Sequence, residues 1–134
     1  MMSEQEINNL MKGDYVSINT FDGCKIIQVA SIETHIITGK SESRWHWAMN
    51  KDVSPISITK PFLENNGFLQ VQNLFVLCGS IDICEFKFFI EYNLSNNFLF
   101  INDGIIPKPV QYIHELQHIF KICGLDGNIK IDKL

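Results

Sequence analysis

The chain has 134 residues, which is enough for one domain or for two small lobes. Its apolar fraction of 46% excludes a generally disordered chain. The net charge of −4, with Arg44 as the only arginine, disfavours a protein whose main task is to wrap nucleic acid, because neutralising phosphates requires clustered lysine and arginine.

The first half of the chain predicts a short helix followed by several short strands. Ser3 and Glu6 form a candidate capping box, and apolar residues at helical spacing predict a helix over about 4–11. The later segments alternate apolar and polar residues between tight turns, as antiparallel strands do. Pro55 favours an edge position for the last of them. The expected strands, which together predict a small, strongly bent sheet or barrel, are 15–19, 24–32, 34–38, 44–50 and 53–58.

The second half predicts a sheet and a longer helix. Thr59 can cap a short helix from Lys60 that ends at Gly67. Strands are expected over 68–76, 82–93 and 98–102, a helix over 110–123 that stops at Gly124, and a final strand over 128–132. The clearest strand signal is one apolar face, made of Cys84, Phe86, Phe88, Ile90 and Tyr92.

These elements predict an α+β fold. A small bent antiparallel sheet or barrel-like lobe comes first, and an antiparallel sheet packed by a C-terminal helix follows. We expect 1–134 to be a single unit with lobes over 1–58 and 59–134. The apolar face of the C-terminal helix, Ile113, Leu116, Phe120 and Cys123, is expected to pack against Phe86, Phe88 and Ile90.

The cysteines and the start of the chain indicate the expected cellular compartment of the protein. Cys24, Cys78, Cys84 and Cys123 show no C-x-x-C spacing and lie among apolar neighbours, so we expect buried free thiols. No apolar run approaches the roughly 18 residues of a membrane span, and no secretory signal is visible at the start. We therefore expect a cytoplasmic protein with no membrane partner.

The stretch His114-Glu115-Leu116-Gln117-His118 matches H-E-x-x-H on a predicted helix. Histidines four residues apart lie on one helix face and can bind one Zn²⁺. The glutamate can then act as general base on a zinc-bound water. The motif is thus typical of a zinc-dependent hydrolase, with His114 and His118 as metal ligands and Glu115 as the catalytic residue.

Two observations disfavour that hydrolase. In the longer metzincin pattern, Lys121 and Gly124 occupy the glycine and third-histidine positions, and only Asp126 and Asp132 follow as acidic residues. The helix wheel also places both histidines opposite the apolar face, where we expect them to face water. We therefore predict no metal or other cofactor, although a third ligand from upstream stays an alternative, with His46, Glu85 and Glu91 as its candidates.

A second candidate site lies in the segment around Arg44, Trp45 and Trp47. Basic and aromatic residues close together can stack on and neutralise single-stranded nucleic acid. The competing interpretation, which we favour, is that both indoles face the core from one strand while Arg44 and His46 face water.

Three stretches resemble a family of small uncharacterised proteins from phages and mobile elements of gut anaerobic bacteria. They are LMKGDYV with the following KIIQV, ISITKPFLENNGF, and YIHELQHIFKICGLDGNIKI at 112–131. Family members end in phrases similar to the last stretch, and one variant lacks both the glutamate and the second histidine. The resemblance implies that this stretch serves as a helix packing on a sheet.

The leading hypothesis is therefore a non-catalytic accessory protein of phage or mobile-element origin that acts by binding. Its expected partner is an unknown macromolecule or a second copy of itself, and nucleic acid is disfavoured. The alternatives are the zinc-dependent hydrolase and a weak binder of single-stranded nucleic acid through Arg44, Trp45 and Trp47.

Overall fold

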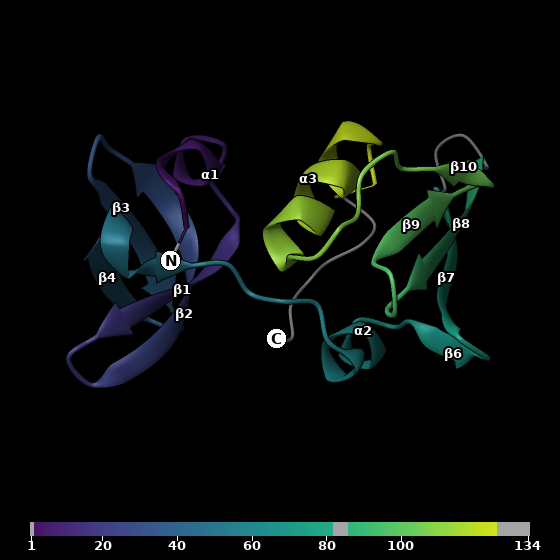
Figure 1. Ribbon diagram of the computed structural model, residues 1–134, viewed down its shortest axis with the longest axis horizontal. Coiled ribbons are helices and arrows are strands. Elements are labelled where there is room, and N and C mark those ends of the chain that lie inside the picture. Colours follow the sequence, from purple (N-terminus) through teal and green to yellow (C-terminus); the bar gives the residue numbers. More distant parts are fainter. Residues whose placement is uncertain (1, 82–85, 126–134) are drawn as a thin grey trace. The chain divides into compact units, whose positions relative to one another are not determined.

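The computed structural model describes residues 2–81 and 86–125 and shows an α+β fold with two antiparallel five-stranded sheets (Figure 1). Its contacts divide the chain into two compact units. The first holds the chain up to Ser57 together with Tyr112–His114, and the second holds Ile58–Gln111 together with the chain from Glu115. The predicted fold class is confirmed, and each unit is described by itself below.

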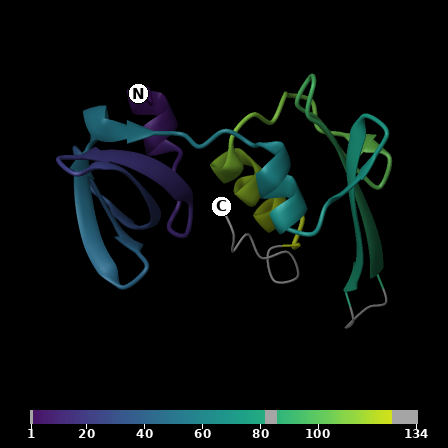
Figure 2. The same cartoon turned by 90° about the horizontal axis from the view of Figure 1, so that it is seen from below.

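The first unit is a helix followed by a bent sheet. Its strands run in the order β4-β3-β2-β1-β5, so that the last strand returns to lie beside the first. The sheet curls far enough for β4 to approach β1, as Figures 1 and 2 show. Its elements are α1 (Glu4–Asn8), β1 (Tyr15–Thr20), β2 (Gly23–Ile32), β3 (Ile36–Ser41), β4 (Arg44–Met49), the 3-10 helix η1 (Asn50–Asp52) and β5 (Val53–Ser54).

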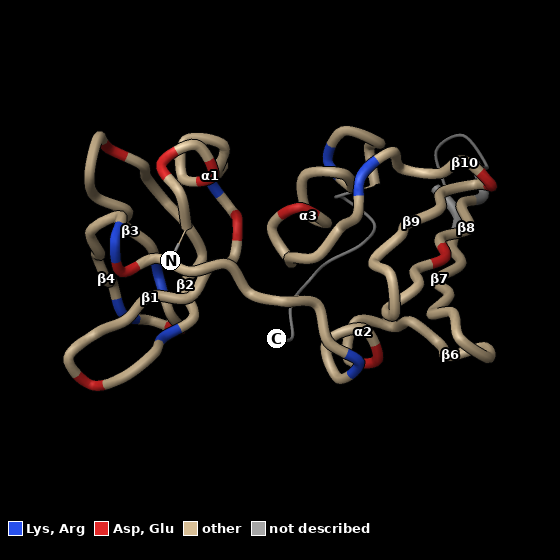
Figure 3. Tube along the Cα trace, in the orientation of Figure 1, with Lys and Arg blue, Asp and Glu red and all other residues tan. Residues whose placement is uncertain are grey.

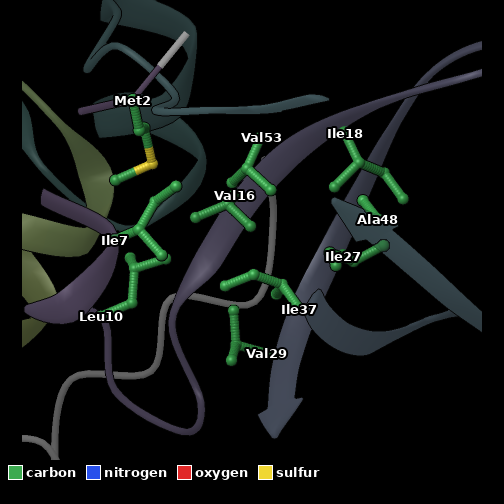
Figure 4. Close-up of a cluster of buried hydrophobic side chains, with 10 residues drawn as sticks. All are labelled: Met2, Ile7, Leu10, Val16, Ile18, Ile27, Val29, Ile37, Ala48 and Val53. Atoms are coloured by element: carbon green, nitrogen blue, oxygen red, sulfur yellow. The ribbon is translucent and has the colours of Figure 1, made fainter. Parts of the chain in front are cut away.

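Local signals in the sequence explain the first unit. Ser3 and Glu6 form the predicted capping box at the start of α1. Strand β5 lies at an edge of the sheet and ends just before Pro55, as expected from a residue that cannot donate to a ladder. One hydrophobic cluster fills the inside of the sheet and the underside of α1 (Figure 4): Met2, Ile7, Leu10, Val16, Ile18, Ile27, Val29, Ile37, Ala48 and Val53.

The second unit is a meander of hairpins with helices on one side. Each strand pairs with the next along the chain, in the order β10-β9-β8-β7-β6. Figures 1 and 2 both show α2 and the second-unit part of α3 on the same side of this sheet. The elements are α2 (Lys60–Asn65), β6 (Leu69–Val71), β7 (Leu74–Ile81), β8 (Phe86–Asn93), β9 (Phe98–Ile101), β10 (Gly104–Ile105) and α3 (Ile113–Ile122).

The pattern of burial in β8 explains which face of this sheet forms the core. Phe88, Ile90 and Tyr92 are buried as predicted, whereas Phe89 between them is exposed. Cys84, the side chain of Phe86 and the predicted strand 128–132 lie outside the described residues. The predicted strand 68–76 is in fact split, because Gln72, with a φ of 56°, turns the chain between β6 and β7.

The C-terminal end of α3 corrects the prediction for Cys123. Gly124, with a φ of 72°, ends the helix as predicted, and its N–H donates to the carbonyl of Lys121. The Leu125 N–H donates to the carbonyl of Phe120 at 2.7 Å, which completes a Schellman motif. The chain reversal buries Leu125 and leaves Cys123 exposed, so Leu125 takes the core position expected for the cysteine.

Two neighbouring residues of α3 offer a matched test of the core. Phe120 is 1% exposed and Ile122 is 82% exposed. We expect Phe120→Ala to lower the free energy of unfolding by about 3–5 kcal/mol, because it leaves a cavity in the core. Ile122→Ala should change it by less than about 0.5 kcal/mol. Urea denaturation measures both values, and equal losses for the two variants would contradict the packing.

Tyr92 generates a prediction about pH. Its buried hydroxyl donates to the carbonyl of Val110 and lies 3.0 Å from the side-chain amide of Asn97. Burial, together with the charge of Glu115, raises the pKa of Tyr92 well above its usual value. The folded state therefore favours the neutral phenol. The resulting contribution to the free energy of unfolding is constant at neutral pH and is lost as the pH rises above about 10.

We expect Tyr92→Phe to lower the free energy of unfolding by about 1–3 kcal/mol at neutral pH, because the carbonyl of Val110 loses its donor. The variant should also lose less stability than the wild type when the pH is raised above about 10. Denaturation at neutral and alkaline pH measures both effects. Parallel pH profiles for the two proteins would contradict the role given to the phenol.

Candidate functional site

The H-E-x-x-H stretch lies in the first turns of α3, and the division between the two units falls between His114 and Glu115. The prediction that both histidines face water is wrong for His114, which is 6% exposed, while His118 is half-buried. The His114 ring stacks on the ring of Tyr112, with centroids 6.0 Å apart and planes inclined by 8°. Helical periodicity alone did not reveal this neighbour, because Tyr112 precedes the helix.

Main-chain contacts hold the start of α3 against the segment that follows β5. Tyr112 forms an isolated antiparallel bridge with Ser57, and the Ile113 N–H donates to the carbonyl of Ile56 at 2.8 Å. His114 follows directly and is thereby placed in the interior.

In the same unit, hydrogen bonds from Ser3 lower the pKa of Glu6, and the charge of His114 lowers it slightly further.

Glu115 has a local structural role. It is the third residue of α3, and its Oε1 accepts a hydrogen bond from the Gln111 N–H at 3.2 Å. A carboxylate in the first turn also interacts favourably with the positive end of the helix dipole. The residue proposed as a general base by the sequence thus stabilises the beginning of the helix.

The candidate third ligands are placed as follows. His46 lies on β4 in the first unit, and Glu91 lies on β8 in the second unit, on the sheet face opposite Ile90 and Tyr92. Glu85, Asp126 and Asp132 lie outside the described residues. Within residues 2–81 and 86–125, the side chains of histidine, cysteine, aspartate and glutamate form no group of three suited to a metal ion.

The second candidate site is an exposed aromatic pair on β4, formed by Trp45 and Trp47. Their side chains are 63% and 67% exposed, so the prediction that they face the core is wrong. The core-facing position of β4 is instead Ala48, which pairs with the buried Ile37 of β3. Trp45 and Trp47 therefore lie together on the outer face of the sheet.

The interior of the sheet explains this orientation. At Gly39 of β3, a Cβ atom would lie 2.5 Å from the main-chain oxygen of Gln28 and 2.8 Å from Cδ1 of Ile27. The inner face beside Gly39 is thus filled by β2, and β4 places the small, buried Ala48 on that face. The alternation of the segment correctly predicted a strand, but the larger apolar side chains occupy the opposite face from the one expected.

A lysine accompanies the aromatic pair. Lys40 lies opposite Trp45 in the β3–β4 ladder, and its Nζ lies 5.6 Å from the centre of the Trp45 ring, a cation–π arrangement. On its other side, Lys40 pairs with Gln28 of β2, which in turn pairs with Tyr15 of β1. This cross-strand row combines aromatic, amide and cationic groups without a carboxylate.

Arg44 does not join the aromatic pair on the outer face. It lines a polar pocket of about 610 Å³ at the end of the first unit, between the β1–β2 and β3–β4 turns. Figure 3 shows both signs of charge spread over the first unit, and the pocket itself contains both. Its lining residues are Thr20, Asp22, Cys24, Lys25, Ile26, Ser41, Glu42, Arg44 and His46.

The cysteines differ from the prediction of buried thiols. Cys24, Cys78 and Cys123 are free and exposed, and Cys84 lies outside the described residues. Cys24 and Cys78 lie on the outer faces of their sheets, opposite Asn19 and Phe89 respectively. The Cys24 thiol donates to Oδ1 of Asn19 at 3.0 Å. Apolar neighbours in sequence therefore did not predict burial.

Comparisons with protein-family models, with curated proteins and with solved structures found no match to the chain. Among the helices in the described part of the chain, none has the length and apolar character required to span a membrane. The site must therefore be interpreted from its own geometry.

The zinc hypothesis has a direct test. We expect the purified protein to contain much less than one zinc per chain, and His118→Ala to leave that content unchanged, because no third ligand joins the two histidines within residues 2–81 and 86–125. Elemental analysis after dialysis against zinc measures the content. Stoichiometric zinc in the wild type that is lost in His118→Ala would support the hydrolase instead.

Proposed function

We propose that the chain is a non-catalytic binding module of phage or mobile-element origin, active in the cytoplasm, that recognises its ligand with the aromatic pair Trp45 and Trp47. The observation that carries this proposal is the exposure of both indoles on one sheet face. Exposed tryptophans that share a face are uncommon on a surface without a binding role, because they leave a large apolar area in water.

The ligand that best fits the aromatic pair is single-stranded nucleic acid. Alternate residues of a strand are about 6.7 Å apart, because each residue rises about 3.3 Å. Stacked bases repeat at about 3.4 Å, so the two indoles offer space for one base between them or a separate stacking surface each. The nearby Lys40 provides a cation for the phosphate, and no carboxylate lies in its cross-strand row.

The charge of the protein limits how tightly such a ligand binds. Lys40 and Arg44 are the cations of the β3–β4 hairpin, and Glu42 in its turn partly offsets them. Arg44 lines the polar pocket and does not join the aromatic pair, so Lys40 makes the one phosphate contact expected there, with a slope of about −0.7 in a plot of log affinity against log salt. We therefore propose weak binding that is dominated by stacking.

A fluorescence titration with a labelled single-stranded oligothymidylate tests this proposal. We expect weak binding in low salt and a salt slope no steeper than about −2. Trp45→Ala combined with Trp47→Ala should weaken binding at least about tenfold, because one stacked base contributes about 1–3 kcal/mol. Phe21→Ala is the matched control, since Phe21 is 98% exposed in the β1–β2 turn and is not part of β4.

Two results would contradict nucleic-acid binding. One is the absence of binding in low salt. The other is equal binding by the double variant and the wild type, which would place the ligand elsewhere on the molecule.

A further inference from the structure

One end of the first sheet has a polar interior. Further along the strands the inner face is apolar, since Ile27 of β2 and Ala48 of β4 belong to the hydrophobic cluster. Near the β1–β2 and β3–β4 turns, polar side chains instead line the pocket of about 610 Å³. Small-molecule sites usually enclose about 300–1,000 Å³. The pocket is therefore large enough for a small ligand, and the side chains that face into it decide which chemistry it accepts.

Three side chains with nitrogen donors line this pocket from the inner face of the sheet. Alternate residues of a strand point to the same face. Lys25 therefore lies on the same face of β2 as the buried Ile27. Arg44 and His46 lie on the same face of β4 as the buried Ala48. Two strands thus direct two cations and an imidazole towards the space inside the sheet.

The donors of these three side chains are not used within the protein. Within residues 2–81 and 86–125, the side chains of Lys25, Arg44 and His46 form no hydrogen bond or ion pair with another protein group. The carboxylates of the lining come from the turns rather than from the strands, and they are Asp22 and Glu42. Both cations are exposed and stay available to a solute that enters the pocket.

We propose that this pocket binds a small molecule through a phosphate group. A phosphate monoester carries a charge of about −1.5 to −2 at pH 7, which Lys25 and Arg44 together neutralise. A planar guanidinium donates two parallel hydrogen bonds to an oxyanion, and a lysine binds phosphate as a point charge. A carboxylate has a single negative charge and matches the two cations less well. The carboxylates of the turns favour a ligand whose other groups are neutral or cationic.

The pocket and the aromatic pair are separate sites that share one strand. Arg44 and His46 alternate with Trp45 and Trp47 along β4, so the two sets lie on opposite faces of the sheet. Lys40 accompanies Trp45 and is not among the residues that line the pocket. The inference therefore goes beyond the proposed function, and Lys40 supplies a cation of the same charge outside the pocket.

An NMR titration of the full chain with inorganic phosphate, at constant ionic strength, tests the pocket. We expect saturable shifts in the amides of Lys25, Ser41 and Arg44. Arg44→Gln should weaken binding at least about tenfold, because it removes the charged, bidentate donor. Lys40→Gln removes the same charge from the outer face of the same hairpin. It is the matched control and should bind phosphate as the wild type does.

Three results would overturn the proposal. They are the absence of saturable shifts, equal weakening by Arg44→Gln and Lys40→Gln, and binding of acetate as tight as that of phosphate. The amide spectrum of each variant reports whether it is folded, and Lys25→Gln repeats the test from β2 if Arg44→Gln does not fold. Because this titration contains no nucleic acid, its failure leaves the oligothymidylate result intact, and the converse also holds.

Discussion

The alternation of β4 between a buried inner residue and exposed outer residues is the constraint on which the surface of the first unit depends. Ala48 is buried on the inner face, opposite Ile37 of β3. Because alternate residues of a strand point to opposite faces, Trp45 and Trp47 lie on the outer face, where they are exposed. The burial of one small residue thus fixes the face on which both indoles lie.

Much of the fold follows from local signals that act over a few residues. Three signals each begin or end an element for one local physical reason, and the structure has all three. They are the capping box at Ser3, the proline after β5 and the glycine after α3. The sequence does not predict the turn at Gln72, because a non-glycine residue adopts a positive φ there. Such a turn has no sequence signal comparable to an Asn-Gly or Asp-Gly pair.

The candidate sites were harder to predict because they depend on contacts far apart in sequence. Alternation in β4 indicates a strand, but either phase of the alternation is consistent with the residues, and the burial of Ala48 opposite Ile37 of β3 fixes the phase. The helix wheel predicts a solvated position for His114, but residues around Ser57 hold the start of that helix in the interior. In both places, tertiary packing decided the orientation of a correctly predicted element.

The position of Glu115 has a consequence for searches that use short metal-binding patterns. Acidic residues are favoured at the third position of a helix for reasons of backbone chemistry alone, and Glu115 bonds the main chain of Gln111 from that position. The glutamate of an H-E-x-x-H string that coincides with a helix start therefore has a role in the backbone whether or not the histidines bind zinc. Recording where the string falls relative to the first helical residue would show which of these glutamates also stabilise a helix start.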